Sequence, residues 1–319
     1  MCCVLAVSRS GFHAWLTRPA SAHTLADRRL LIDIWRVHLE HRSANGGVKI
    51  WRTLNERGIA CGKHRVARLR RENDIEAKRR QRARITVEHH KTAAPAPDLL
   101  QRRFRATAPD CIWAGDMTFI RTCEGWLHLA VLVDLFSRKV VGWAMDQRPG
   151  QVVHLGALSM ALTHRRPGPG LIHHTDRSSQ YNTPAYREML SVHGARASMN
   201  GRKVPQDNAV AESFLSNLKN ELIHHCDFRS RDAARAAIFD YIELFYNRKR
   251  IHQSLGYRTP EQVERMAWCL IKLSTEPGIA QLGLFYPQQR KPRRRLCRNP
   301  IGSSRSARSH VEKTGSIND

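Results

Sequence analysis

The sequence is short of negative charge. It has 28 aspartates and glutamates against 53 lysines and arginines, which gives a formal net charge of +25. An excess of this size indicates a polyanionic partner, most simply nucleic acid. A generally basic, soluble surface is the alternative, but the positive residues cluster along the chain instead of spreading evenly.

Paired cysteines and long apolar runs are also missing. The eight cysteines include no Cys-x-x-Cys pair, which disfavours a zinc ribbon or a disulfide framework and favours reduced thiols. The histidines at 89–90 and 224–225 lack the spacing of a zinc module. No run of eighteen apolar residues occurs, and the start lacks the basic segment and cleavage pattern of a signal peptide. These absences favour a cytoplasmic protein with no membrane partner.

Three acids stand out against this basic background. Asp116 lies in the apolar, β-rich stretch WAGDMTFI, Asp176 ends the short apolar run LIHHT, and Glu212 lies in the second turn of an amphipathic helix. Carboxylates on two strands and one helix can converge on a pair of divalent cations, which at about 3.5–4 Å apart clamp the attacking and leaving oxygens of a phosphodiester. Magnesium suits such a site, because it combines one or two carboxylates with phosphate oxygens and water. The alternative for Glu212 alone is an ordinary glutamate on a surface helix.

The segment from Trp113 to Glu264 resembles the catalytic core of the DDE transposases, a core of the retroviral-integrase type. It is most similar to the second-frame product of the insertion sequence 3 family. The motifs that carry the resemblance are WAGDMTFIRTCEGWLHLAVLVDLFSRKVVGWAM, LIHHTDRSSQY, SMNGRKVPQDNAVAESFLSNLKNEL and YIELFYNRKRIHQSLGYRTP. The resemblance implies a ribonuclease-H-like fold and an enzyme that cleaves DNA and transfers strands during transposition.

The resemblance also implies roles for individual residues. It assigns catalysis and metal binding to Asp116, Asp176 and Glu212, with two Mg²⁺ (or Mn²⁺) ions as cofactors. Asp116 is expected to bridge both ions, and each of the other two acids to hold one. Lys219, seven positions after the glutamate, is expected to contact DNA.

Four further residues lie next to these acids in the sequence. Arg177 follows Asp176 and is expected to contact DNA. His174 and Gln180 lie on either side of the same acid in the sequence. They are expected to orient substrate or water without binding the metal themselves. Asn208 is expected to act likewise, although capping of the helix explains it equally well.

The pattern of apolar residues predicts an α/β fold, a mixed five-stranded sheet with flanking helices, and this order agrees with the ribonuclease-H-like fold that the resemblance implies. Predicted strands cover residues 112–122, 126–134, 139–145, 171–174 and 196–199, and predicted helices cover 152–163, 183–192, 207–222 and 233–246. In the helix at 207–222, Val210, Phe214, Leu218 and Leu222 recur every four residues and are expected to face the sheet. Trp113, Trp126 and Trp143 are assigned to the core rather than to base-stacking surfaces.

A small all-α module is expected before the core, over residues 24–80. Two short apolar faces joined by a glycine-bounded turn at 57–62 are typical of a helix-turn-helix, whose second helix enters the major groove. The arginines expected to contact DNA from that helix are Arg65, Arg68, Arg70 and Arg71. The alternative is a plain α-hairpin that packs on the core.

Composition divides the chain into five parts. An N-terminal segment covers residues 1–23, and the helix-turn-helix-like DNA-binding module covers 24–80. A basic, proline- and alanine-rich linker covers 81–108, and the integrase-type catalytic core covers 109–265. Residues 266–319 are basic and low in apolar content, which predicts a disordered tail.

The expected partners are the terminal inverted repeats of an element, target DNA and the first-frame protein of the same element. A homo-oligomer on DNA, in the bacterial cytoplasm at the nucleoid, is also expected. One rival interpretation is a catalytically decayed DNA-binding copy or regulator of the element, because Ser178 stands where the family usually has glycine, a change that could distort the loop beside Asp176. Lys203, Val204 and Gln206 depart from the family pattern as well. The other rival is a nuclease that acts on RNA–DNA hybrids.

Overall fold

The protein is described by a computed structural model that covers residues 8–78, 96–101, 105–201 and 208–275. Its centre is a five-stranded sheet in the order β3-β2-β1-β4-β5. The strands are β1 (Ile112–Thr122), β2 (Gly125–Asp134), β3 (Val140–Asp146), β4 (Ile172–Thr175) and β5 (Arg196–Met199). β1, β2 and β3 pair antiparallel, whereas β4 and β5 run parallel to β1 and to each other. The predicted mixed five-stranded sheet is therefore confirmed.

The pairing of β4 covers only the first part of β1. β4 contacts β1 from Ile112 to Gly115, and the last of these pairs joins Gly115 to Thr175. From Asp116 onward, β1 pairs only with β2 among the described residues. One edge of the second half of β1 is therefore left without a neighbouring strand.

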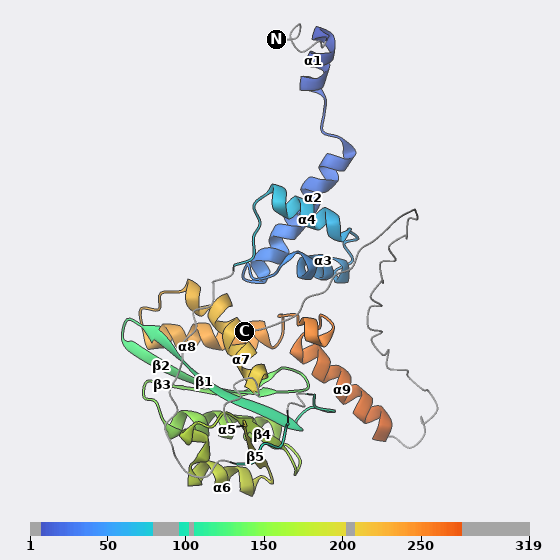
Figure 1. The fold of residues 1–319 in the computed structure, drawn as a ribbon. Helices are drawn as coiled ribbons and strands as arrows, with labels where there is room; N and C mark the ends of the chain where they lie inside the picture. Colours follow the sequence, from blue (N-terminus) through green and yellow to red (C-terminus); the bar gives the residue numbers. More distant parts are fainter. Residues whose placement is uncertain (1–7, 79–95, 102–104, 202–207, 276–319) are drawn as a thin grey trace, which may run out of the picture. The chain divides into compact units, whose positions relative to one another are not determined.

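Helices cover the two faces of the sheet, as Figure 1 shows. On one face, α5 (Gln151–Arg165) and α6 (Pro184–Val192) enclose a core that includes Trp113, Leu158 and Tyr186. On the other, α7 (Ala209–Glu221) and α8 (Arg231–Phe239) enclose a core with Phe214 and Ile238. α8 leads into a π-helical segment, Asp240–Tyr246, where the sequence had predicted one continuous α-helix.

The buried face of α7 agrees with its predicted period. Val210, Phe214, Leu218 and Leu222 are all buried, and Leu215 lies beside them. This burial fixes the rotation of the helix and so places Glu212 and Lys219 away from the core. On the opposite face, Gly142 allows α5 to approach β3 closely, because a Cβ there would lie 2.4 Å from the carbonyl oxygen of Ala157.

The N-terminal region is helical, with α1 (Arg9–Thr17), α2 (Ala22–Glu40), α3 (Gly47–Glu56) and α4 (Lys63–Glu72). The last three enclose their own small core, formed by Leu30, Ile34, Val37, Ile50, Leu54, Val66, Leu69 and Ile75. Gly58, at a φ of 80°, lies in the turn between α3 and α4, where glycine adopts the left-handed conformation without strain.

The last described element is α9 (Pro260–Thr275). The expectation of a disordered tail from residue 266 is wrong for its first ten residues, because α9 continues through the boundary drawn at 265. Ala267 is still buried in this helix. The rest of that tail and most of the predicted linker lie outside the described residues. Within the described part of the chain, no helix is both long enough and apolar enough to cross a membrane.

Candidate active site

The register of the sheet brings the first two acids together. Because Gly115 of β1 pairs with Thr175 of β4, the next residues along the two parallel strands are Asp116 and Asp176. Asp116 Oδ1 accepts a hydrogen bond from the backbone nitrogen of Met117 at 2.8 Å. Burial, the negative charge of Asp176 and then that of Glu212 raise the pKa of Asp116 to about 7. Asp116 therefore lies within electrostatic range of both other acids.

The third acid comes from α7, whose start is attached to β1. Asn208 Nδ2 donates a buried hydrogen bond of 2.9 Å to the carbonyl oxygen of Gly115, next to Asp116. Glu212 follows one turn later and is exposed. Lys219, two turns further on, lowers the pKa of Asp116 through its positive charge. α7 thus presents a carboxylate and an ammonium group to the same aspartate.

The arrangement fits a magnesium ion that is bound partly by substrate. No group of three His, Cys, Asp or Glu side chains within the described residues lies close enough to enclose a metal by itself. Magnesium does not need such a cage, since it takes one or two carboxylates and fills its octahedron with phosphate oxygens and water. Besides burial, the negative charges of Asp176 and Glu212 raise the pKa of Asp116. A divalent cation relieves this kind of repulsion between carboxylates.

The loop after Asp176 is unstrained despite its departure from the family pattern. Ser178 has φ −61° and ψ 137°, a conformation open to any L-residue. Its backbone nitrogen donates to Asp176 Oδ1 at 3.0 Å. The distortion that the missing glycine suggested is therefore absent from this loop. The other departures, at 203–206, lie outside the described residues.

The predicted neighbours of Asp176 lie close to β5. His174 is buried, and its Nδ1 lies 2.8 Å from Ser198 Oγ. Arg177 Nε donates to the carbonyl oxygen of Asn200 at 2.6 Å. Gln180 lies in the short 3₁₀ helix η1 (Ser179–Asn182) and is half-buried. The first two residues therefore tie the segment that carries Asp176 to the next strand.

Sequence reasoning missed an aromatic pair beneath the acids. Tyr181 is buried, and the charges of Asp116 and Asp176 add to burial in raising its pKa. Its ring lies edge-to-face against His154 of α5, with centroids 4.6 Å apart. In the sequence, Tyr181 stands out only as a tyrosine five positions after Asp176. That spacing does not distinguish it from other core aromatics.

The arginines of α4 fall into three groups. Arg65 Nε and Arg68 Nη2 each lie 2.6 Å from a carboxylate oxygen of Asp27 on α2. Arg70 is half-buried, and burial lowers its pKa. Arg71 is exposed. The structure therefore ties Arg65 and Arg68 to a neighbouring helix and leaves Arg71 at the surface.

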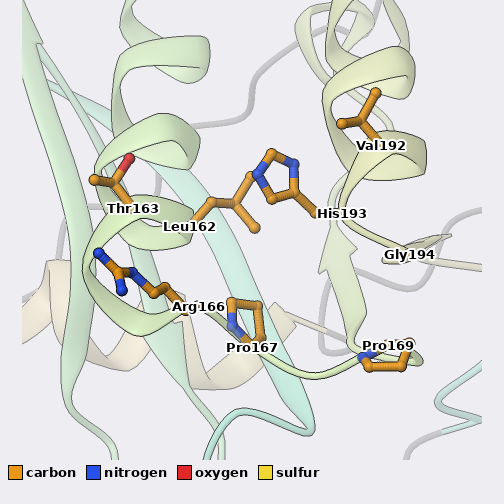
Figure 2. Close-up of a pocket in the computed structure, with 8 residues that line it drawn as sticks. All are labelled: Leu162, Thr163, Arg166, Pro167, Pro169, Val192, His193 and Gly194. Carbon is orange, nitrogen blue, oxygen red and sulfur yellow. The ribbon is translucent and has the colours of Figure 1, made fainter.

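A surface hollow lies apart from the acids, between the ends of α5 and α6 (Figure 2). It has a volume of about 530 Å³. Its lining residues are Leu162, Thr163, Arg166, Pro167, Pro169, Val192, His193 and Gly194. None of the predicted site residues belongs to it, so the hollow is not part of the candidate active site.

The chain matches two family models described as an integrase core domain, over residues 106–205 and 193–260. It also matches a model described as an HTH-like domain over residues 25–83. A solved structure of the HTLV-2 integrase catalytic core domain in complex with magnesium is similar at 20% identity and a TM-score of 0.38. That match covers 50% of this chain and 99% of the other.

Two curated relatives share much more of the sequence. The uncharacterized 31 kDa protein of insertion element IS600 from Shigella sonnei is 40% identical over 260 residues, which is 82% of this chain and 96% of the relative. The transposase InsF of insertion sequence IS3A from Escherichia coli K12 is 38% identical over 267 residues, which is 83% of this chain and 92% of the relative. With its integrase core and HTH-like region, the chain belongs to the insertion sequence 3 family of transposases.

Proposed function

We propose that this transposase uses Asp116, Asp176 and Glu212 to hold divalent metal for DNA strand cleavage and strand transfer. The proposal is supported by the way the fold gathers acids that lie up to 96 positions apart in the sequence, so that the charges of both Asp176 and Glu212 act on Asp116. Two adjacent parallel strands and a helix anchored to one of them bring these acids together. A basic, half-buried Lys219 beside them suits a polyanionic substrate.

The metal would be Mg²⁺ or Mn²⁺, with two ions held by the three carboxylates and by phosphate oxygens of the DNA. When bound, the ions supply an activated oxygen nucleophile and neutralise the leaving oxygen. Asp116 would contribute to both ions, because β1 pairs with the strand that leads to Asp176 and is hydrogen-bonded to the start of the helix that carries Glu212. The carboxylates themselves form no covalent bond to DNA in this scheme.

The residues around the acids would bind and position the DNA. Lys219 would hold a phosphate near the reacting bond, and Arg177 would contact the same strand. His174 and Gln180 would set the position of Asp176, while Asn208 would set the start of α7. Arg65, Arg68, Arg70 and Arg71 would contact DNA from the HTH-like module, where Arg68 and Arg71 are exposed.

The whole chain would act on the terminal inverted repeats of its element and on target DNA, as an oligomer in the bacterial cytoplasm at the nucleoid. The first-frame protein of the element would be a partner in recognising the ends. The division into a segment at 1–23, a DNA-binding module at 24–80, a linker at 81–108 and a core that starts at 109 is part of this proposal.

The test is a metal-dependent cleavage and joining assay on DNA that carries the element ends. Asp116→Asn, Asp176→Asn and Glu212→Gln are each expected to abolish cleavage and to keep DNA affinity within about twofold. Glu188→Gln, a change at an exposed acid of α6, is the matched control and should stay active. Strand transfer retained by any of the three amide variants would overturn the assignment.

The assay also separates the rival functions. DNA that is joined to a new strand identifies a transposase, whereas products that are only cut, and only in RNA–DNA hybrids, identify a hybrid nuclease. A chain that binds the ends but never cuts them, with or without the first-frame protein, identifies a decayed copy.

A further inference from the structure

Two large aromatic side chains lie exposed on the hairpin that carries Asp116. Phe119 of β1 is 49% exposed and Trp126 of β2 is 50% exposed. Their rings meet edge-to-face, with centroids 5.3 Å apart and an interplanar angle of 87°. Trp126 was expected in the core, and that prediction is wrong, because the helices leave this end of the sheet uncovered.

The register explains the exposure. Arg121 pairs with Trp126 and Phe119 with His128, so the two aromatics lie on one face of the hairpin, at diagonal positions. That face continues into the part of the sheet against which α5 packs, where Gly142 and Ala144 of β3 contact the helix. α5 covers the middle of the sheet and leaves the hairpin end open. We call Phe119 and Trp126 together the aromatic platform.

Positive charge lies beside the aromatic platform. Lys219 Nζ lies 6.0 Å from the centroid of the Phe119 ring, and Lys219 lies on α7, the helix whose start is hydrogen-bonded to β1 next to Asp116. Side chains alternate along a strand, so Asp116 and Phe119 point to opposite faces of β1. Lys219 reaches the Phe119 ring from α7, at the edge of β1 that has no paired strand within the described residues. Arg121, exposed on the platform's face, adds a second cation.

The remaining charges around the aromatic platform are largely satisfied. The Arg231 guanidinium donates to the carbonyl oxygens of Glu124 and Trp126 and holds the turn in place. The Glu124 carboxylate accepts a hydrogen bond of 2.9 Å from the backbone nitrogen of Arg231. The surface therefore offers two aromatic faces flanked by cations, the combination that binds unpaired nucleotides by stacking and phosphate contact.

We propose that the aromatic platform stacks an unpaired base at the end of the DNA strand that enters the acid cluster. The inference rests on the proposed function, because that function brings DNA to Lys219. Three residues along a strand separate Asp116 from Phe119, about 10 Å, which is roughly the rise of three stacked nucleotides. Because Asp116 and Phe119 lie on opposite faces of β1, the path also passes round the edge of the strand beside Lys219. Three nucleotides in an unstacked, extended overhang span more than this rise of about 10 Å and can run from the acids, past Lys219, to the platform.

The experiment uses the full chain at low salt without divalent metal. One probe is a duplex with a three-nucleotide 3′ overhang that ends in 2-aminopurine, whose fluorescence is quenched on stacking, and the other is the blunt duplex. The parent chain should quench the probe and bind the overhang more tightly than the blunt end. Phe119→Ala and Trp126→Ala should each weaken overhang binding roughly 5- to 150-fold, the range of one base–aromatic stack, and leave blunt-duplex affinity unchanged.

Three further variants make the test specific. Phe119→Tyr and Trp126→Phe keep an aromatic face and should retain quenching. Trp268→Ala removes a tryptophan of similar exposure, 45%, from α9 and should leave both affinities as in the parent. Circular dichroism confirms that each variant folds.

The outcomes separate this inference from the function on which it rests. Alanine variants that keep the overhang preference overturn the platform, even if the parent cleaves DNA. Variants that lose oligomerisation in sedimentation but keep overhang affinity overturn it too, because the aromatics then face a second copy of the chain. A parent that shows the platform-dependent preference but never cleaves DNA supports the platform and overturns the catalytic assignment.

Discussion

Asn208 Nδ2 donates a hydrogen bond of 2.9 Å to the carbonyl oxygen of Gly115, and both residues lie next to the acid cluster. Asn208 precedes α7 without forming a side-chain cap hydrogen bond, so its amide joins the helix to the sheet instead of completing the helix end. The bond connects the residue before Asp116 with the residue four positions before Glu212. This buried contact, together with the apolar packing of α7 on the sheet, sets the distance between two of the three acids.

Asn208→Asp is expected to slow cleavage while leaving DNA affinity nearly unchanged. The carboxylate cannot donate to Gly115, and a buried polar group without its partner costs about 1–3 kcal/mol. A shift of α7 by about 1 Å reduces the rate on the order of 100-fold, because reacting groups lose alignment. Single-turnover cleavage and urea unfolding measure the two effects. Asn220→Asp, a part-buried asparagine of the same helix, is the control, and equal rates for the two variants would contradict the role of Asn208.

The strands and the buried face of α7 could be predicted from the sequence because their signals are local. Apolar runs gave β1 and β5 with the observed bounds, and the four-residue period of α7 identified its buried side. The exposure of Trp126 could not be predicted, since it depends on how far α5 extends over the sheet. The same limit applies to Asn208, whose hydrogen-bond partner lies 93 residues away. It also applies to Asp27, which forms ion pairs with Arg65 and Arg68.

Arg71→Ala is expected to weaken DNA binding evenly across sequences. Arg71 is exposed on α4, where its charge can replace a counterion on the phosphate backbone. Loss of one phosphate contact reduces the slope of log K against log[salt] by about 0.9. Titrations between low and physiological salt measure this slope. Arg36→Ala removes an arginine of α2 that is paired with Asp33 and should leave the slope unchanged, whereas a parent chain with a flat salt response would refute backbone binding altogether.

Arg165→Met is expected to destabilise the fold by about 3–5 kcal/mol. Its guanidinium bridges Asp110, before β1, and Glu264 on α9, at 2.7 and 2.8 Å, and all three side chains are largely buried. Removal leaves buried Asp110 without its cation and leaves Glu264 with Lys139, 3.0 Å away, as its remaining cation, which costs far more than an exposed pair contributes. Urea unfolding measures the change. Arg265→Met removes the neighbouring exposed arginine, 3.8 Å from Glu261, and should cost well under about 1 kcal/mol; a similar loss in both variants would contradict the bridge.

Acidification is expected to destabilise the fold through His252. The ring is buried and lies 3.3 Å from Arg250 Nη1, and burial followed by this positive charge lowers its pKa to about 2. In the unfolded chain the pKa is near 6.5. The folded pKa is the lower one, so the stabilisation is complete above pH 6.5 and is lost as the pH falls. Between pH 6.5 and pH 5 the loss from this residue is about 2 kcal/mol.

His252→Gln tests this assignment, because the amide does not titrate. The variant is expected to show a shallower fall in unfolding free energy between pH 6.5 and pH 5, by about 2 kcal/mol relative to the parent. His64→Gln, a change at an exposed histidine of α4, should follow the parent curve. A His252→Gln curve parallel to that of the parent would show that the ring accepts a proton without unfolding the region. The acid sensitivity would then arise elsewhere, with buried His173 as the next residue to replace, because burial lowers its pKa to about 3.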